Sequence, residues 1–293
     1  MTAAAPLDIL IIGHNGQVAQ ALRRHLAGHR VQALGRDQFD LADTDQLADR
    51  LRQLAPDLII NAAAYTAVDK AEGEEESKLA FAINAEGPGL VAQVAAELDI
   101  PLIHYSTDYV FDGLKSGPYV ESDTPNPLGV YGESKLAGEQ AIIAAGGPHL
   151  ILRTSWVYSR QGSNFLLTMQ RLLQERAELR VVDDQIGAPT SADTIAASTA
   201  ALIARWQAGQ AGEWGVYHLT AQGDTSWFGF AQAIGEDLQA RGLPCARLLP
   251  IPSSEYPTPA RRPPNSRLDC SRLEEQWQVT QPHWRQALID CLK

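Results

Sequence analysis

The feature that most constrains the fold is the regular alternation of short apolar runs with longer helical patterns in the first half of the chain. The first run, Leu7 to Ile12, is almost continuously apolar and breaks at Gly13. Similar runs lie at 30–34, 57–61, 101–106 and 149–153, and helical patterns separate them at 17–27, 44–54, 80–98 and 131–144. Nearly continuous apolar runs are typical of parallel strands covered on both faces. The alternation therefore predicts an α/β fold with a Rossmann-type, doubly wound parallel sheet.

The pattern loosens in the second half of the chain. Helical patterns and apolar runs continue less regularly, at 164–175, 179–182, 191–206, 215–219 and 226–240, before a proline-rich tract at 250–264. We therefore expect a first domain over residues 1–155 and a smaller C-terminal lobe over residues 156–293. A segment near 191–219 is also compatible with a return to the Rossmann core.

Composition excludes several classes of partner. The net charge is −11, and the positive residues are scattered, which argues against nucleic acid. The three cysteines, Cys245, Cys270 and Cys291, have no metal-ligand spacing. No segment approaches the roughly 20 apolar residues of a membrane span, and residues 1–6 lack the positive start of a signal peptide. We expect no membrane partner and a cytoplasmic location.

The turn after the first apolar run has the spacing of a dinucleotide-binding loop. Gly13, Gly16 and Ala19 stand where a strand meets a helix, so the backbone can approach a pyrophosphate near the helix N-terminus. The alternative is a tight turn that needs glycine only for positive φ. The expected cofactor-binding residues here are Gly13, Asn15, Gly16, Gln17 and Val18. Residues 1–155 are thus expected to bind the dinucleotide, and residues 156–293 mainly the substrate.

Residues at the ends of the second and third strands extend this prediction. Arg36 stands where many NAD-specific proteins carry a carboxylate, and its guanidinium could pair with a 2′-phosphate, which favours NADPH while leaving NADH possible. A solvated surface arginine is the alternative. Asp40 and Leu41 are spaced to flank an adenine, and small side chains after the third strand leave room for a cofactor. These last residues are Ala62, Ala63 and Ala64, followed by Tyr65.

Tyr131 and Lys135 form a candidate proton-transfer pair. Residues four apart on a helix point the same way, so the ammonium can approach the phenol or a ligand beside it and stabilise phenolate. Thr107 and Asp108 follow the fourth strand, at the edge where ligands of such sheets bind. A hydroxyl at Thr107 could hydrogen-bond a substrate carbonyl beside Tyr131, although a threonine that ties down a loop is an alternative.

In order along the chain, these motifs resemble the extended short-chain dehydrogenase/reductases, and longer strings resemble the dTDP-4-dehydrorhamnose reductases among them. The strings are Asn61-Ala-Ala-Ala-Tyr-Thr-Ala-Val-Asp-Lys-Ala-Glu72, Ser106-Thr-Asp-Tyr-Val-Phe111, Leu152-Arg-Thr-Ser-Trp-Val-Tyr158, Val182-Asp-Asp-Gln-Ile-Gly-Ala-Pro-Thr190 and Arg262-Pro-Pro-Asn-Ser-Arg-Leu-Asp269. Several lie outside the shared cofactor fold. The resemblance therefore extends into the lobe that distinguishes substrates.

The resemblance implies hydride transfer from NAD(P)H to the C4 ketone of dTDP-4-dehydro-β-L-rhamnose, the last step of dTDP-rhamnose biosynthesis. In this interpretation Tyr131 donates the proton, Lys135 keeps the phenol acidic and binds the nicotinamide ribose, and Thr107 orients the carbonyl. The implied substrate-binding residues are Thr107, Asp108, Tyr131 and Trp156, the last packing its apolar ring against the deoxysugar.

Two other functions remain open. A nucleotide-sugar 4-epimerase would keep the same scaffold, whereas a dehydratase would carry a second carboxylate where this chain has Tyr109. A non-catalytic regulatory subunit would have lost catalytic side chains that are present here. Some related enzymes dimerise through glutamates that share Mg²⁺, but Ala21 and Asp193 stand at two such positions. Mg²⁺ is therefore possible but not supported by this sequence, no metal ligand is assigned, and we predict either a monomer or a homodimer.

Overall fold

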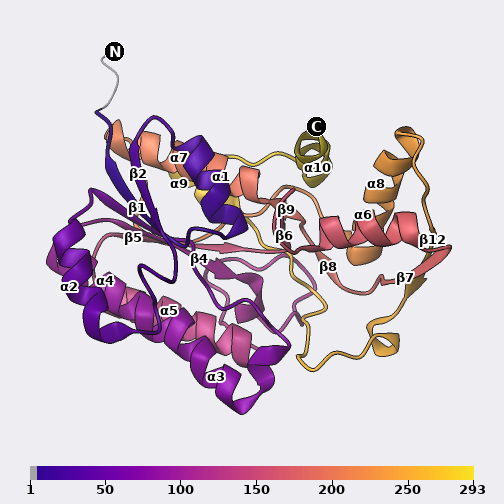
Figure 1. The fold of residues 1–293 in the computed structure, drawn as a ribbon, viewed down its shortest axis with the longest axis horizontal. Coiled ribbons are helices and arrows are strands. Elements are labelled where there is room, and N and C mark those ends of the chain that lie inside the picture. Colours follow the sequence, from indigo (N-terminus) through magenta and orange to yellow (C-terminus); the bar gives the residue numbers. More distant parts are fainter. Residues whose placement is uncertain (1–4) are drawn as a thin grey trace.

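Six parallel strands form the central sheet of the computed structural model, which describes residues 5–293 (Figure 1). Residues 1–4, on which the signal-peptide expectation partly depends, lie outside that range. The strands run in the order β10-β5-β4-β3-β1-β2. Their bounds are Gly215–His218, His149–Thr154, Leu102–Thr107, Leu58–Asn61, Asp8–Ile12 and Arg30–Leu34. The strand order reverses direction between β1 and β3, which is where such sheets bind ligands.

Helices cover both faces of the sheet, as the sequence predicts (Figure 1). Helices α1 (Gln17–His25) and α7 (Ala192–Gln207) pack on one face, and α2 (Thr44–Leu54), α4 (Gly87–Glu97) and α5 (Val130–Ala145) pack on the other. Strand β1 shows why its run is apolar throughout, because Ile9 and Ile11 enter the first core and Leu10 and Ile12 the second. The fold is therefore α/β and Rossmann-like, in agreement with the sequence pattern.

The helix predicted over 80–98 begins earlier than expected. Helix α3 (Glu74–Phe81) runs through a π-helical segment, Ala82–Glu86, directly into α4. The wide turn contains Asn84, which is fully buried and bonds to the backbone of Tyr65 and to Ser134 Oγ. An acidic first turn after Gly73 marks the true start. The periodicity missed it because those side chains are charged and contribute no apolar stripe.

The segment 191–219 lies against the central sheet. Strand β10 pairs in parallel with β5, so that Tyr217 lies opposite Leu152. Helix α7 contributes Ile195 and Leu202 to the core shared with α1. Its N-terminus is capped by Ser191, whose hydroxyl accepts from the Thr194 amide.

Most of the remaining C-terminal half forms a smaller lobe beside the carboxyl end of the sheet (Figure 1). Its core includes Leu166, Phe230, Trp284 and Leu288. Its helices are α6 (Phe165–Glu175), α8 (Trp227–Ala240) and α10 (Trp284–Leu292). Short strand pairs join them: β7 (Glu178–Val182) with β12 (Arg247–Ile251), β6 (Val157–Tyr158) with β9 (Thr190–Ser191), and β8 (Ile186–Gly187) with β11 (Thr225–Ser226). Helix α9 (Ser271–Trp277) instead adds Leu273 and Trp277 to the core that α7 forms with the sheet. Within residues 5–293, no helix is both long and apolar enough to span a bilayer.

Candidate active site

The glycine turn lies at the switch point between β1 and β3. Gly13 has a φ of +106°, and a Cβ there would lie 3.0 Å from the Ala63 nitrogen, so both its conformation and its space require glycine. Gly16 is the N-cap of α1 and supplies no side-chain cap. The first amides of α1 are therefore free of a capping side chain, which fits the binding of a phosphate group.

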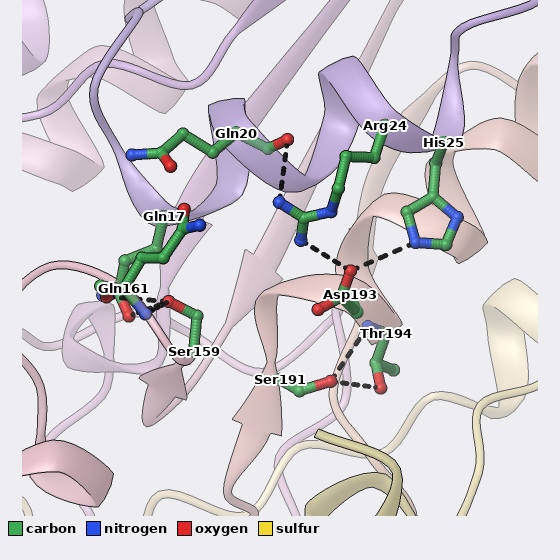
Figure 2. Close-up of polar contacts among 9 residues, drawn as sticks. All are labelled: Gln17, Gln20, Arg24, His25, Ser159, Gln161, Ser191, Asp193 and Thr194. Carbon is green, nitrogen blue, oxygen red and sulfur yellow. Dashed lines mark hydrogen bonds and ion pairs between the residues drawn. The ribbon is translucent and has the colours of Figure 1, made fainter. Parts of the chain in front are cut away.

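The neighbouring predicted cofactor residues have different environments. Asn15 is exposed, and its carbonyl accepts from Gln20 Nε2. Gln17 turns toward the C-terminal lobe, where its Oε1 accepts a hydrogen bond from Ser159 Oγ at 2.9 Å (Figure 2). The same oxygen also accepts from Asn164 Nδ2 at 2.8 Å. Val18 packs against the core beneath α1. The start of α1 is thus attached to the C-terminal half of the chain.

Arg36 and Asp40 face each other at the end of β2. Their ion pair, at 3.0 Å, is largely exposed, so it is weak and leaves the guanidinium able to turn toward a ligand. Partial burial alone would raise the pKa of Asp40, but the Ala42 amide and Arg36 together bring it below its usual value. Leu41 does not face this surface with Arg36 and Asp40. Its side chain is buried in the core, and its backbone packs against Gly87 of α4.

The small residues after β3 line the other side of the switch point. Ala62, Ala63 and Ala64 are partly buried beside the Gly13 turn. Tyr65 is held by Asn84, which accepts from its amide and donates to its carbonyl. Asn84 is a residue that the sequence reasoning missed, since a buried asparagine in a helix leaves no periodic signal.

Thr107 and Asp108 meet at the carboxyl end of β4, where a short 3-10 turn (η3, Asp108–Val110) begins. Thr107 caps this turn and donates to Asp108 Oδ1 at 3.1 Å. Burial raises the pKa of Asp108 to about 6, against the opposing effects of Ser266 and Thr107. Its other oxygen, Oδ2, is buried without a hydrogen-bond partner. That oxygen therefore has an unused capacity to accept a hydrogen bond.

Tyr131 stands in the first turn of α5, beside Thr107. Burial raises the pKa of its phenol, and the polar side chain of Thr107 acts in the opposite direction. Removal of the phenol from water is the largest influence on this pKa, and the acidifying effect expected of the Lys135 ammonium stays a prediction. The phenol consequently holds its proton at neutral pH, which suits a proton donor.

Lys135 is buried one turn further along α5 and is not bonded to Tyr131. Its Nζ donates to the Tyr105 carbonyl at 2.7 Å and lies 3.1 Å from His104 Nε2. Burial lowers the pKa of Lys135 to about 8, while the nearby carboxylate of Glu139 acts in the opposite direction. The ammonium is thus only moderately stable at this position.

A buried ion pair supports this end of the sheet. Arg153 of β5 binds both carboxylate oxygens of Glu139, at 2.6 Å in the closest contact, and both side chains are under 5% exposed. Glu139 also accepts a 2.5 Å hydrogen bond from Ser106 Oγ. The pair fastens α5 to β4 and β5. Sequence reasoning missed it because a glutamate in a helix and an arginine in a strand are ordinarily exposed.

Trp156 lies at the start of the C-terminal half in a strained conformation, with a φ of +47°. Its ring stacks on Trp227 with centroids 3.6 Å apart, and Gly187 leaves room for it on another side. The indole is half-buried, so part of it remains accessible. Part of the apolar surface expected to meet a deoxysugar is therefore covered by Trp227, which the sequence did not indicate.

The proline-rich tract closes over the active-site tyrosines. Arg262 donates to Tyr109 Oη at 3.0 Å and to Asp69 at 2.7 Å, and the Tyr109 ring packs edge-on against Tyr131 with centroids 5.5 Å apart. Tyr131 lines a narrow recess together with Arg261 of this tract. The tract is thus structured and reaches the candidate site.

A larger hollow, of about 530 Å³, lies between Gln17, Arg24 and Asp193. Figure 2 shows that the Asp193 carboxylate faces Arg24, at 2.8 Å, and His25, at 3.3 Å. Asp193 is thus engaged by two basic side chains. Within the described residues, no cluster of histidine, cysteine and acidic side chains has the arrangement of a metal site.

Comparison with known proteins gives consistent results over nearly the whole chain. The family model described as the RmlD substrate binding domain matches residues 7–293. A dTDP-4-dehydrorhamnose reductase of Burkholderia thailandensis is 45% identical over 98% of both chains, and one of Sinorhizobium fredii is 44% identical over 96% of this chain and 95% of its own. The crystal structure of dTDP-4-dehydrorhamnose reductase from Bacillus anthracis in complex with NADP has a TM-score of 0.90 at 32% identity, covering 98% of this chain and 99% of its own.

Proposed function

This chain belongs to the dTDP-4-dehydrorhamnose reductase family, and from that premise we propose how its residues carry out the family's reaction. The protein is an NAD(P)H-dependent oxidoreductase. It reduces the C4 ketone of dTDP-4-dehydro-β-L-rhamnose to the alcohol of dTDP-β-L-rhamnose. The observation that carries the assignment of roles is the meeting of Thr107 and the protonated phenol of Tyr131 at the carboxyl end of β4.

The residues present fit a dinucleotide. A cradle for the dinucleotide is formed by Gly13, the uncapped start of α1 and the small residues after β3. A larger side chain at Gly13 would keep the cofactor away from the backbone. The NADP-bound relative supports NADPH as the cofactor, and the exposed guanidinium of Arg36 would pair with its 2′-phosphate. When bound, the nicotinamide supplies the hydride.

The side chains of this site divide the remaining work. Reduction places negative charge on the ketone oxygen, and donors aimed at that oxygen lower the barrier. Tyr131 donates the proton that this oxygen takes up, and Thr107 orients the carbonyl with its hydroxyl. Lys135 supports the phenol with positive charge, and Asp108 binds a sugar hydroxyl with its free oxygen. Trp156 contributes the accessible part of its ring to the deoxysugar.

The same proposal covers the organisation of the chain. Residues 1–155 bind the cofactor, and residues 156–293 mainly bind the sugar nucleotide, with 191–219 belonging to the cofactor half. The pairing of β10 with β5 supports that last assignment. A dTDP-sugar is the small-molecule partner. A cytoplasmic location and a monomeric or homodimeric state stay predictions, the latter measurable by light scattering.

The decisive experiment incubates purified protein with dTDP-4-dehydrorhamnose and NADPH and follows both the nicotinamide absorbance and the sugar product. We expect one NADPH to be consumed for each dTDP-rhamnose formed. An epimerase would interconvert sugars without net loss of NADPH, and a regulatory subunit would leave both unchanged. Either result would overturn the proposed reaction.

A further inference from the structure

A series of polar contacts connects the segment after β3, which lies beside the Gly13 turn, with Lys135. It passes through two side chains, Asn61 and His104, to which the proposed reaction assigns no role. It begins at the backbone amide of Ala63, which donates to Asn61 Oδ1 at 3.1 Å. Asn61 Nδ2 lies 3.0 Å from His104 Nδ1, and His104 Nε2 lies 3.1 Å from Lys135 Nζ. Asn61, His104 and Lys135 are each about 1% exposed or less, so water does not reach these contacts.

The Ala63 amide determines which atoms donate and which accept in the contacts that follow. A backbone amide can only donate, so Asn61 presents its oxygen to Ala63 and its NH₂ group to His104. His104 Nδ1 must then accept. Burial, together with the charge of Lys135, lowers the pKa of His104 well below its usual value, so the imidazole is neutral and carries a single N–H. That hydrogen is on Nε2, and it points at Lys135.

An ammonium at Lys135 has no lone pair to accept this hydrogen. While Lys135 is charged, His104 and Lys135 therefore present two donors to each other, a conflict that is costly where neither group can turn to water. The amine form removes the conflict, because its lone pair accepts from His104 while an N–H still bonds to the Tyr105 carbonyl. This series of contacts thus favours the amine.

Other charged groups near Lys135 do not change the direction of this effect. Glu139, on the same helix, favours the ammonium, but Arg153 of β5 binds its carboxylate in two places. His218 of β10 is neutral near pH 7, because burial lowers its pKa to about 3. Asp108 of η3 is placed beside Tyr131 and acts on the phenol.

We propose that His104 is a positioning residue for the reaction: oriented by Asn61, its Nε2–H opposes the ammonium of Lys135 and so sets the alkaline pH at which the enzyme loses activity. The link to activity rests on the proposed role of Lys135, whereas the state of His104 does not. Asn61 acts as the element that fixes which imidazole nitrogen carries the hydrogen.

The first test reads the tautomer directly. Nitrogen NMR of protein with labelled histidine distinguishes an N–H from a bare ring nitrogen, and His104→Phe identifies the His104 signals among the seven histidines. We expect the free protein to show hydrogen on Nε2 and none on Nδ1. Hydrogen on Nδ1, or on both nitrogens, would overturn the proposal whether or not the protein reduces any sugar.

The second test uses a nearly isosteric substitution to reverse the direction of these hydrogen bonds. In Asn61→Asp both carboxylate oxygens accept, so His104 moves its hydrogen to Nδ1 and offers the lone pair of Nε2 to the ammonium. We expect the alkaline limb of kcat/KM to rise by about one pH unit, and the Lys135 side-chain NMR titration, identified with Lys135→Met, to rise with it. An unchanged limb and titration would refute the role of His104.

The added charge of Asn61→Asp could raise the titration without involving His104, and the double variant with His104→Phe separates the two effects. When His104→Phe is the background, Asn61→Asp is expected to shift the Lys135 titration by much less than it does beside His104. An equal shift in both backgrounds would assign the effect to charge alone and overturn the proposal. If the protein reduced no sugar, the proposed function would fail, but these NMR measurements would still determine the protonation state of His104.

Discussion

Replacing Glu139 by glutamine removes the counter-ion of a guanidinium that is 4% exposed and has no access to water. Arg153 donates to Glu139 through both Nε and Nη2, and its Nη1 is already without a partner. Removing one member of such a buried pair leaves an uncompensated charge and costs about 3–5 kcal/mol. This is a large part of the roughly 5–15 kcal/mol that separates folded from unfolded protein.

Urea unfolding followed by tryptophan fluorescence measures this loss. With a slope of about 3 kcal/mol per molar urea, we expect the midpoint of Glu139→Gln to fall by about 1–1.7 M. Glu133→Gln is the matched control, because Glu133 is exposed on the same helix and its loss should change stability by less than about 0.5 kcal/mol. Glu139→Leu combined with Arg153→Met should recover much of the loss, since no charge stays buried. Equal midpoints for Glu139→Gln and Glu133→Gln would refute the reasoning.

Three further outcomes follow from the same structure. Tyr131→Phe should lower kcat by roughly 10²–10⁴ with NADPH affinity nearly unchanged, measured by steady-state kinetics and fluorescence titration; near-normal turnover would remove Tyr131 from the donor role. Arg36→Ala should raise the KM for NADPH far more than that for NADH, and equal changes would show that the guanidinium does not bind the 2′-phosphate. Between about pH 8 and 10.5 the unfolded chain holds a proton that native Lys135 has lost, so the contribution of Lys135 to the unfolding free energy should rise with pH there, and Lys135→Met should abolish that rise.

The sequence predicted the fold well where burial leaves a periodic signal. Strand β1 is apolar at every inward position because both of its faces are covered, and Gly13 is required by a positive φ that few other residues adopt. The start of α3 was missed because its first turn is acidic. The return of 191–219 to the sheet stayed open because pairing between β10 and β5 depends on contacts distant in sequence.

At the candidate site, the sequence indicated the groups that perform chemistry and missed those that orient them. Tyr131 and Thr107 belong to recognisable strings and are brought together by the structure. Asn84, His104 and the Glu139–Arg153 pair were not predicted, because a buried polar side chain is identified by its partners and not by its spacing. The raised pKa of Tyr131 was not predicted for a related reason, since spacing reveals a neighbouring charge but not the loss of water around the phenol.

Burial shifts the pKa values of three groups at this site away from their usual range, and each shift bears on the reduction. Burial raises the pKa of Asp108 to about 6 and lowers the pKa of Lys135 to about 8, and it raises the pKa of the Tyr131 phenol beyond both. Between about pH 6 and 8 the site therefore holds a carboxylate that can accept from a sugar hydroxyl, an ammonium beside the helix turn, and a phenol with a proton to give. A reduction that ends in protonation of an alkoxide needs the last of these, and the raised pKa of Tyr131 keeps that proton on the phenol throughout this pH range.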